Sequence, residues 1–379
     1  MRVLGLMSGT SADGVDAVLA DFSGRPQRPR WRILASAAMP YPGGLRHQLV
    51  AAGQGTALSA QDWLELAEAV TEAQAAAARA CDPSGLAELV GCHGQTLWHR
   101  PPEPGRIGAS WQLLLGPRLA QLLQCPVIFD FRSADLALGG QGAPLVPATD
   151  AALLGGIGGW RALLNLGGIA NLTLLPPASG PDRRRAVLGW DCGPANTLLD
   201  LATQRFSEGR LNFDADGAWA AQGQVEESLI ECWLQEPYFC QRPPKSTGRE
   251  LFGGHDLERR LAEIGALEPQ HTAADALATL TAFSAAVVAQ DLVQGPLPLE
   301  LLVAGGGARN RSLMGQLVRR CRGMAVRPLV ELGIAEDQRE ALAFALLAWW
   351  HHHRHPASLP SVTGAPKASR LGLRAAVPG

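Results

Sequence analysis

One pattern occurs twice in this chain: two apolar strands joined by a short polar loop that contains glycine. The first copy, LGLMSGTSADGVDAVL, spans Leu4–Leu19, and the second, LLNLGGIANLTLL, spans Leu163–Leu175. Glycine with Asn or Asp is ordinary turn chemistry, so either copy alone predicts only a tight hairpin. Because one copy lies in each half of the chain, the repetition predicts a duplicated architecture, and this constrains the fold more than any single element.

A third glycine-rich stretch, LLVAGGGARN at Leu301–Asn310, runs from an apolar strand through three consecutive glycines towards a helix. Glycines let the backbone approach a flat or anionic ligand, and the first turn of a helix offers free N–H groups and the positive end of its dipole. A lone Gly-Gly-Gly would be a weak signal. Together with the two hairpins, it predicts loops that hold a ligand.

Short apolar runs alternate with long helical stretches elsewhere, which predicts an α/β protein with mixed sheets. The expected strands are Val3–Met7, Val15–Ala20, Arg32–Ala37, Leu89–Cys92, Val127–Phe131, Ala162–Leu166, Leu172–Leu175, Val187–Trp190 and Leu299–Ala304. The expected helices are Ala60–Ala80, Gly116–Gln124, Asn196–Phe206, Gln224–Gln235, Ala273–Gln294, Asn310–Cys321 and Ala335–His352.

The length of 379 residues exceeds the size at which one core usually keeps growing, so two packed domains with a cleft are expected. We place the first domain at residues 1–130, joined by 355–379, and the second at 131–354. The formal net charge of −2 gives no basic field for nucleic acid and no cationic face for an anionic membrane. Small molecules are therefore the expected partners.

No apolar stretch reaches the ~18 residues that a membrane span needs, and Asp13 and Asp16 lie where a secretion signal would be apolar. We therefore expect a cytoplasmic protein. The 7 cysteines form no C-x-x-C pair and no metal-type spacing, which predicts reduced, mostly buried thiols rather than disulfides or a zinc site. The run His351–His353 with His355 is expected to be a solvated helix end.

The three glycine-bearing stretches resemble the sugar kinase, Hsp70 and actin superfamily, in which two related domains each offer a phosphate-binding hairpin and a later glycine-rich turn holds adenosine. Further motifs, which span Met7–Ala365, follow in the order found in the anhydro-N-acetylmuramic acid kinase family. They are MSGTSADGVDA, GCHGQTLWH, FRSADLALGGQGAPLVP, NLGGIANLT, DCGPANTLLD, PPKSTGRELF, VAGGGARN, EALAFALLA and LPSVTGA. The chain is similar to that family over nearly its whole length.

This resemblance implies a two-lobed actin-like ATPase fold, in which a ribonuclease-H-like unit is duplicated, with mixed sheets and an interdomain cleft. It also implies a reaction: water opens the 1,6-anhydro ring of 1,6-anhydro-N-acetylmuramic acid while ATP phosphorylates O6. ATP and Mg²⁺, a role in peptidoglycan recycling and a homodimer are further implications. Ala12, Cys192 and Ala195 depart from residues common in the family, but the acidic and amide groups are in place.

The first hairpin loop offers backbone N–H groups and a hydroxyl that can cradle phosphates, and Asp13 can hold Mg²⁺ through its water shell. The alternative for Asp13 is a plain turn cap. The second hairpin would meet the phosphates from the other domain, and a tight turn is again the alternative. The expected nucleotide-binding residues are Gly9, Thr10, Ser11, Ala12, Asp13, Gly14, Val15, Asp16, Asn165, Gly167, Gly168, Asn171, Gly305, Gly306, Gly307 and Asn310.

Asp191 follows the expected strand Val187–Trp190, a position from which a carboxylate projects from a sheet edge into a crevice. It is the expected general base, which takes a proton from the water that attacks the anomeric carbon. The alternative is a helix cap, although Asn196 lies closer to the helix start. Glu340 is either an exposed acid that complements a helix dipole or, as the resemblance implies, a second catalytic-site carboxylate that positions the sugar.

Six further side chains are expected to bind the sugar: His93, Gln95, Thr96, Arg132, Asp135 and Lys245. Arg132 would meet the lactyl carboxylate of a muramyl sugar, and the alternative is an Arg–Asp surface pair with Asp135. His93 has a structural role in the core as its alternative. Lys245 is one of two lysines in the chain, which favours a use for its compact ammonium.

Two other functions fit the same pattern. A chaperone-like or filament-forming ATPase would hydrolyse ATP without a sugar, so turnover that depends on an anhydromuramyl sugar distinguishes a kinase from it. A simple hexose or amino-sugar kinase would use the same aspartate to deprotonate a hydroxyl, and oxygen from labelled water would not enter its product.

Overall fold

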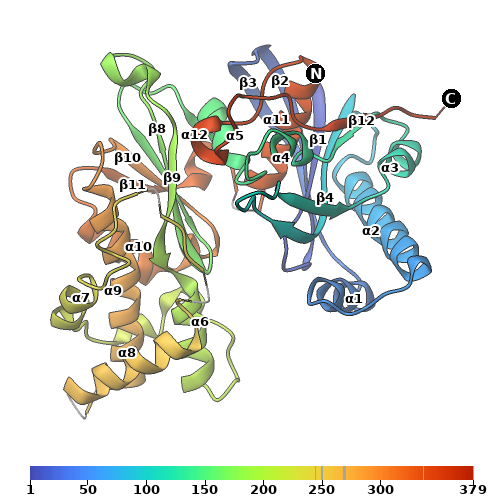
Figure 1. Ribbon diagram of the computed structural model, residues 1–379. Coiled ribbons are helices and arrows are strands. Elements are labelled where there is room, and N and C mark those ends of the chain that lie inside the picture. Colours follow the sequence, from blue (N-terminus) through green and yellow to red (C-terminus); the bar gives the residue numbers. More distant parts are fainter. Residues whose placement is uncertain (244, 249–250, 268–269, 336, 379) are drawn as a thin grey trace. The chain divides into compact units, whose positions relative to one another are not determined.

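The structure is a computed structural model that describes residues 1–243, 245–248, 251–267, 270–335 and 337–378. The chain divides into two compact units, and each unit is built around a sheet of its own (Figure 1). Unit 1 comprises Met1–Leu154 with Asp337–Gly379, and unit 2 comprises Gly155–Glu336.

The sheet of unit 1 starts with an antiparallel meander of β1 (Arg2–Ser8), β2 (Gly14–Arg25) and β3 (Arg28–Pro40). Two later strands, β4 (Leu89–Arg100) and β6 (Val127–Phe129), extend the sheet in parallel on the other side of β1. The central strand β1 is buried along almost its whole length, as a continuous apolar run predicts.

Two short strands and a set of helices complete unit 1. Strand β5 (Ala109–Leu113) pairs with β4, and β12 (Leu373–Ala375) pairs with β6. The helices of unit 1 are α1 (Gly43–Gly53), α2 (Ala60–Cys81), α3 (Gly116–Leu123), α4 (Ser133–Ala137), α5 (Val146–Leu154), α11 (Arg339–His352) and α12 (Pro360–Thr363).

Helix α11 packs closely on β1 and β4 because each strand carries a glycine where the helix crosses it. A Cβ atom at Gly5 would clash with the backbone oxygen of Ala341, and a Cβ atom at Gly91 would clash with that of Phe344. The helix is buried from Ala341 to His351. This contact fixes the first turn of α11 against the strand that leads into the first glycine loop.

Unit 2 repeats the arrangement of unit 1. Strands β7 (Arg161–Leu166), β8 (Ile169–Leu175) and β9 (Leu188–Pro194) form an antiparallel meander, and β10 (Glu300–Ala304) and β11 (Ala325–Pro328) follow in parallel. The strand order β9-β8-β7-β10-β11 corresponds to β3-β2-β1-β4-β6 in unit 1. The duplicated, mixed α/β architecture that the sequence predicts is therefore confirmed.

The helices of unit 2 are η1 (Pro181–Arg184), α6 (Asn196–Phe206), η2 (Ala215–Gly217), η3 (Ala220–Gln222), α7 (Glu227–Trp233), α8 (Gly254–Leu267), α9 (Ala273–Leu292), η4 (Gly306–Arg309), α10 (Arg311–Arg320) and η5 (Leu329–Leu332). Contrary to the expectation from the sequence, α9 is long and apolar enough by composition to cross a membrane. However, 72% of its apolar window is buried inside the protein, as in the central helix of a globular core.

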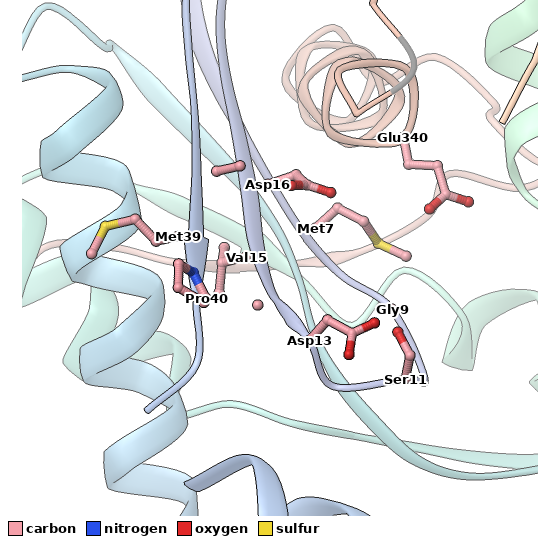
Figure 2. Close-up of a pocket in the computed structure, with 11 residues that line it drawn as sticks. Met7, Gly9, Ser11, Asp13, Val15, Asp16, Met39, Pro40 and Glu340 are labelled. Atoms are coloured by element: carbon pink, nitrogen blue, oxygen red, sulfur yellow. The ribbon is translucent and has the colours of Figure 1, made fainter. Parts of the chain in front are cut away.

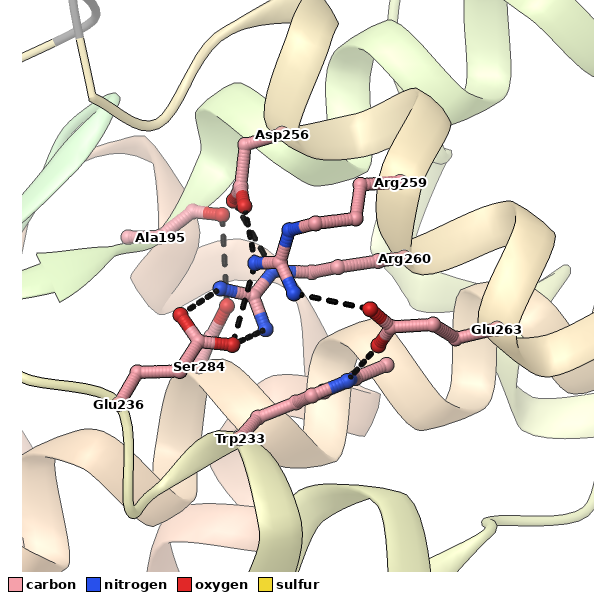
Figure 3. A network of polar contacts seen from close by, with 8 residues as sticks. All are labelled: Ala195, Trp233, Glu236, Asp256, Arg259, Arg260, Glu263 and Ser284. Atoms are coloured by element: carbon pink, nitrogen blue, oxygen red, sulfur yellow. Dashed lines mark hydrogen bonds and ion pairs between the residues drawn. The ribbon is translucent and has the colours of Figure 1, made fainter.

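Buried charges tie α8 to the turn that follows α7 (Figure 3). The Arg260 guanidinium has no exposed surface and donates to the two carboxylate oxygens of Glu236, at 3.1 and 3.0 Å, and to Asp256 at 2.9 Å. It lies 4.8 Å from the ring centroid of Trp233 and 4.4 Å from that of Phe283. Because a buried charge is tolerated only when it is paired, this network holds the turn at Glu236 in one place.

Each expected strand overlaps an observed one, and the expected helix Asn196–Phe206 matches α6 at both ends. The sequence did not predict β5, β11 and β12, which have 5, 4 and 3 residues. Strands this short are too brief to show an alternating pattern. Helices α1, α4, α5, α8 and α12 were also not predicted.

The expected domain boundaries differ from the observed units. The sequence places residues 131–154 and 337–354 in the second domain, but they belong to unit 1. One reason is that α11 packs on the sheet of unit 1. Another is that Asp135 Oδ1, in α4, accepts a hydrogen bond from Thr363 Oγ1 at 2.8 Å, which ties α4 to the carboxyl-terminal segment.

The histidine run ends α11 as expected, but it is not wholly solvated. His352 and His353 are exposed, whereas His351 is buried and its Nδ1 lies 2.9 Å from the carbonyl oxygen of Leu371. His351 therefore joins the end of α11 to the segment before β12.

We expect Gly5→Ala to destabilise unit 1 by about 1–3 kcal/mol, the usual effect of overpacking a core, because the new methyl group meets helix backbone that cannot move independently. Thermal unfolding measures the effect. Gly43→Ala is the matched control, because no atom lies within 4 Å of a Cβ there. Equal melting temperatures for the two variants would show that α11 does not pack as closely as described.

Candidate active site

The turn between β1 and β2 is held by the buried side chain of Gln95. Its Nε2 donates to the carbonyl oxygen of Gly9 at 3.0 Å, and its Oε1 accepts from the Ser8 hydroxyl at 2.5 Å. Ala12 N also donates to Gly9 O, at 3.1 Å, and Ala12 has a φ of +52°, which is unfavourable for a residue with a side chain. The turn is thus a fixed loop. Gln95, an expected sugar contact, therefore supports this loop.

A pocket of about 420 Å³ lies beside this turn within unit 1, and we call it the loop pocket (Figure 2). Its lining residues are Met7, Gly9, Ser11, Asp13, Gly14, Val15, Asp16, Ala38, Met39, Pro40 and Glu340. Expected nucleotide-binding residues between Gly9 and Asp16 therefore meet Glu340 in one cavity of a size typical for ligand sites. The residues from β3 were not predicted, because pairing with β2 brings them to the loop.

Thr10 and Ala12, which were expected to contact the nucleotide, line a neighbouring pocket of about 340 Å³ in unit 1 together with Gln95, Thr96 and Trp98. Thr96 Oγ1 accepts a hydrogen bond from Gln112 Nε2 at 3.2 Å, and Thr96 is half-buried. The first glycine loop therefore borders two pockets: Gly9, Ser11 and Asp13 line the loop pocket, whereas Thr10 and Ala12 line the neighbouring one.

Two carboxyl groups of the loop pocket have raised pKa values. Partial burial, with the charges of Asp337 and Glu340, raises the pKa of Asp16 to about 6. Burial also raises the pKa of Glu340, although the positive charges of Arg339 and Arg132 oppose this. Glu340 lies in the first turn of α11, lines the pocket and keeps an exposed surface. Figure 2 shows the pocket carboxylates together.

Asp13 is the third carboxylate of the loop pocket and the expected Mg²⁺ ligand. Its side chain is 68% exposed and lies 2.8 Å from Arg46 Nη2 in α1. Within the residues described, no group of three or more His, Cys, Asp or Glu side chains could hold a metal without other ligands. A divalent cation here would therefore need ligand phosphates, as Mg²⁺ usually does.

His93, which is buried within β4, and Arg132, which is half-buried after β6, form a pair. Arg132 Nη2 lies 3.0 Å from His93 Nε2, and His93 Nδ1 lies 3.3 Å from the carbonyl oxygen of Ser8. Burial, with the charge of Arg132, lowers the pKa of His93 to about 3, so the ring is neutral and accepts the arginine proton. Arg132 Nη1 donates to Gly142 O at 2.7 Å, but its Nε is buried and has no hydrogen-bond partner among the residues described.

Asp135, expected to contact the sugar, is fully buried and positions a loop instead. Its Oδ2 accepts from Gly142 N at 2.8 Å, and its Oδ1 accepts from Thr363 Oγ1 at 2.8 Å. A Cβ atom at Gly140 would clash with this carboxylate. Asp135 therefore sets the conformation of the loop whose carbonyl group holds Arg132, and a ligand has no access to it.

In unit 2, polar side chains form a row across the sheet. Asn165 on β7 pairs in register with Asn171 on β8, and Asn171 pairs with Asp191 on β9. Cross-strand partners point to the same face, so the three side chains lie side by side and half-exposed. The β8–β9 register shifts at Cys192, a bulge that follows Asp191. Asp191 thus lies within β9, not after the strand as expected.

Asp191 accepts three hydrogen bonds at its carboxylate. Asn171 Nδ2 donates to Oδ1 at 2.8 Å, while Ser246 Oγ and Thr247 N donate to Oδ2 at 2.9 and 3.1 Å. The carbonyl oxygen of Asp191 also accepts from the Tyr238 hydroxyl at 2.7 Å. Sequence reasoning missed Tyr238, Ser246 and Thr247, and the only available signal was the pair of hydroxyl residues next to Lys245 in PPKSTGRE.

The second hairpin loop caps α6 with its carbonyl groups. Gly167 O accepts from Asn196 N at 3.1 Å, and Gly168 O accepts from Ala195 N at 2.9 Å and from Thr197 N at 3.1 Å. Asn196 was expected to cap the helix, but it is the first residue of α6, and its side-chain Nδ2 donates to Leu166 O at 2.8 Å. These amides of α6 are therefore bonded to protein, and any phosphate contact would have to come from the loop itself.

Lys245, another expected sugar contact, is buried. Its side chain is 2% exposed and its Nζ lies 2.8 Å from Asp291 Oδ1 in α9. The ammonium also lies 4.9 Å from the centroid of the Tyr238 ring. Lys245 is therefore part of the core of unit 2 and does not face a ligand.

The glycine-rich turn after β10 borders a pocket of about 420 Å³ within unit 2, which we call the turn pocket. Its lining residues are Asn196, Leu199, Asp200, Phe213, Asp214, Ala215, Asp216, Gly306, Arg309 and Asn310. Gly305 has a φ of +84°, and a Cβ atom there would crowd Asn165 and Leu166, so only glycine lets this turn lie against the second hairpin. Asn310 Oδ1 caps α10 by accepting from Leu313 N at 2.9 Å.

The turn pocket contains residues that the sequence did not single out. Phe213 is 60% exposed, and Asp216 has a φ of +56°. The Asp214 carboxylate accepts from the backbone N–H groups of Trp219 and Ala220, each at 2.9 Å, and so shapes the segment around them. An exposed aromatic residue within LNFDADG was the available signal.

The family model for anhydro-N-acetylmuramic acid kinase matches residues 1–376. A relative of that name from Synechococcus sp. (strain CC9902) is 62% identical over 378 residues, covering 98% of this chain and 99% of the relative. One from Prochlorococcus marinus (strain MIT 9303) is 61% identical over 380 residues, covering 99% of both chains. Among solved structures, xylulose kinase from Rhodospirillum rubrum aligns with a TM-score of 0.48 at 12% identity, covering 98% of this chain and 94% of that chain. The family match and the two relatives show that this chain is a member of the anhydro-N-acetylmuramic acid kinase family.

Proposed function

We propose that the protein opens the 1,6-anhydro ring of 1,6-anhydro-N-acetylmuramic acid with water and transfers the γ-phosphoryl group of ATP to O6, giving N-acetylmuramic acid 6-phosphate. The observation that carries this proposal is the Asp191 carboxylate, half-exposed on the sheet of unit 2 and held by three donors. The names of relatives that align over nearly the whole chain support the choice of substrate.

The hydrogen bonds of Asp191 indicate which of its atoms acts as the base. Within the residues described, Oδ2 accepts two hydrogen bonds and Oδ1 accepts one. A carboxylate oxygen has two acceptor sites, so Oδ1 keeps one for the proton of the attacking water. A base fixed in one orientation needs no reorganisation when that water approaches.

The bond changes balance without a separate acid. The water oxygen bonds to C1 while its proton passes to Asp191 Oδ1, and the C1–O6 bond breaks. The electrons of that bond stay on O6, which bonds to the γ-phosphorus as the bond between that phosphorus and ADP breaks. Capture by phosphorus replaces the protonation that a leaving group normally needs in glycoside hydrolysis.

Arg132 and His93 are suited to bind the lactyl carboxylate. The unpaired, buried Nε of Arg132 is a donor that lacks an acceptor among the described residues, and a ligand carboxylate would provide one. The neutral ring of His93 accepts from Nη2 and so holds the guanidinium in place. Charge-assisted hydrogen bonds of this kind discriminate muramyl sugars from sugars without the acid.

The loop pocket is suited to the phosphates with their metal ion. Asp13 is paired with Arg46, but Asp16 and Glu340 would repel a bare triphosphate, so the pocket fits an anion that arrives with a cation. Asp13 would hold Mg²⁺, and the bound ion would offset phosphate charge. Backbone N–H groups of the loop from Gly9 to Asp13, apart from that of Ala12, which bonds to Gly9 O, would bind the phosphate oxygens.

The turn pocket is suited to the nucleoside. It combines glycine backbone at Gly306 with an exposed aromatic ring at Phe213 and polar groups at Asp200 and Asn310. Flat apolar surface with a few polar groups is the usual composition of a small-molecule site. A role in peptidoglycan recycling in the cytoplasm and a homodimeric state belong to the proposal through the family relation.

Asp191→Asn should lower ring opening and phosphorylation together by about 10²–10⁴-fold, because the amide keeps the size of the side chain but cannot accept the proton of water. Release of ADP and formation of reducing sugar are measured in the same reaction. The surface variant Asp182→Asn in the same unit is the matched control and should keep the parental rate.

Two outcomes would count against the proposal. A folded Asp191→Asn enzyme that binds ATP and sugar and turns over at the parental rate would remove Asp191 from the role of base. Equal ATP hydrolysis by the parent enzyme with and without the anhydromuramyl sugar would favour a chaperone-like ATPase over a kinase.

Arg132→Ala should raise the KM for the anhydromuramyl sugar by an amount equivalent to about 1.5–3 kcal/mol, because a hydrogen bond to a charged group is lost. The KM for an analogue without the lactyl acid is the control and should change little. If both sugars lose the same affinity, Arg132 only holds His93 and the loop at Gly142 and does not bind the acid.

A further inference from the structure

Lys245 joins three elements of unit 2 through its buried ammonium. Its partner is Asp291 in α9, at 2.8 Å, and both side chains are 2% exposed. The other carboxylate oxygen of Asp291 accepts from Trp190 Nε1 on β9 at 3.0 Å. The ion pair therefore connects α9 and the loop at Lys245 with the strand that carries Asp191.

The backbone next to Lys245 holds Asp191 directly. Asp191 N donates to Lys245 O at 3.0 Å, and the next two residues, Ser246 and Thr247, supply both hydrogen bonds to Asp191 Oδ2. Residues 245–248 have no helix or strand of their own. Among its described residues, the loop lies outside the ladders of the sheet, so the buried side chain of Lys245 is a main anchor beside the backbone bond to Asp191.

The turn that carries Tyr238 is anchored in a similar way. The Tyr238 hydroxyl donates to Asp191 O at 2.7 Å, and Phe239 N donates to Glu236 O at 3.0 Å within the same turn. The Glu236 carboxylate is bound by the buried Arg260 (Figure 3). Two buried charge networks thus reach Asp191 through short irregular segments.

We propose that the Lys245–Asp291 ion pair positions the Asp191 carboxylate, with Lys245 acting through Ser246 and Thr247 and not touching the substrate. This inference rests on the proposed function, in which Asp191 is the base. Desolvation offsets much of the attraction in a buried ion pair, so stability alone is a weak reason for such a pair. Its use here is geometric: the pair holds the loop where its hydroxyl and N–H groups face Asp191.

The test replaces both charges with apolar side chains, Lys245→Met with Asp291→Leu, so that no unpaired charge stays buried. The matched control is Arg161→Met with Glu300→Leu, which removes another ion pair of unit 2, whose side chains are 10% and 12% exposed. We expect the first double variant to lose about 10- to 100-fold in kcat, with KM for ATP changed less than about twofold. The control double variant should keep kcat within about twofold of the parent.

A positioning role also predicts that the effects of the substitutions are not additive, because Lys245 acts only through Asp191. In an Asp191→Asn background, the Lys245→Met and Asp291→Leu changes should produce no further loss of kcat. A loss of equal size in both backgrounds would show a general structural effect and overturn the proposal. Parental kcat in the first double variant would overturn it as well.

Ser246→Ala keeps the inference testable if the buried double variant does not fold. It leaves the ion pair intact and removes one donor to Oδ2, so kcat should fall about 5- to 50-fold, and Ser246→Thr should recover part of this loss. Unchanged kcat in Ser246→Ala would contradict the role given to the loop.

Amide hydrogen exchange separates this inference from the proposed function. The N–H groups of Asp191 and Thr247 should exchange faster in the Lys245→Met, Asp291→Leu variant than in the parent or the control pair. If the parent enzyme does not turn over the anhydromuramyl sugar, the proposed function is wrong, while exchange still reports whether the ion pair anchors the loop. Unchanged exchange would show that it does not.

Discussion

The hydrogen bonds that fix the Asp191 carboxylate depend on parts of unit 2 that are distant in the sequence. The register of β8 against β9 places Asn171 directly across from Asp191, and the bulge after Asp191 belongs to this register. Ser246 and Thr247 belong to a loop in which Lys245 forms an ion pair with Asp291 of α9. The sheet, the loop and the core helix therefore share one role, which is to hold a carboxylate in a single orientation on an accessible face.

Unit 1 shows the opposite electrostatic arrangement. Where unit 2 surrounds one carboxylate with donors, the loop pocket brings Asp13, Asp16 and Glu340 together and raises the pKa values of two of them. Like charges in a partly buried pocket are unfavourable for the folded protein without a ligand. Such a pocket is maintained by the packing around it, here by the close contact of α11 with β1.

Local patterns in the sequence predicted the sheets well and the contacts poorly. The two glycine hairpins predicted the duplication because strand period, turn chemistry and their repetition are all local features. Lys245 and Asp135 were expected at the sugar, yet their partners lie 46 and 228 positions away along the chain. No local pattern shows that an ammonium will meet a carboxylate in a core helix, or that a carboxylate will close a loop against the carboxyl-terminal segment.

The same limit explains why some site residues were predicted without their surroundings. Glu340 was identified as a site residue, and the structure places it beside Asp16 only because α11 returns to the first sheet. That return also moved the domain boundary from the expected position. Asn196 was expected to cap α6 because its type and position fit a cap, but carbonyl groups of the second hairpin occupy those amides.

The most direct test of this account is the fate of water oxygen in the sugar product. With a base at Asp191 that activates water for attack on the anomeric carbon, turnover in ¹⁸O-labelled water places the label on C1 and leaves the phosphorylated O6 unlabelled, because O6 is the former bridging oxygen. Mass spectrometry of the product after removal of the phosphate, with the reaction quenched before the anomeric hydroxyl exchanges with solvent, locates the label. Label at O6, or a product without label, would contradict the account.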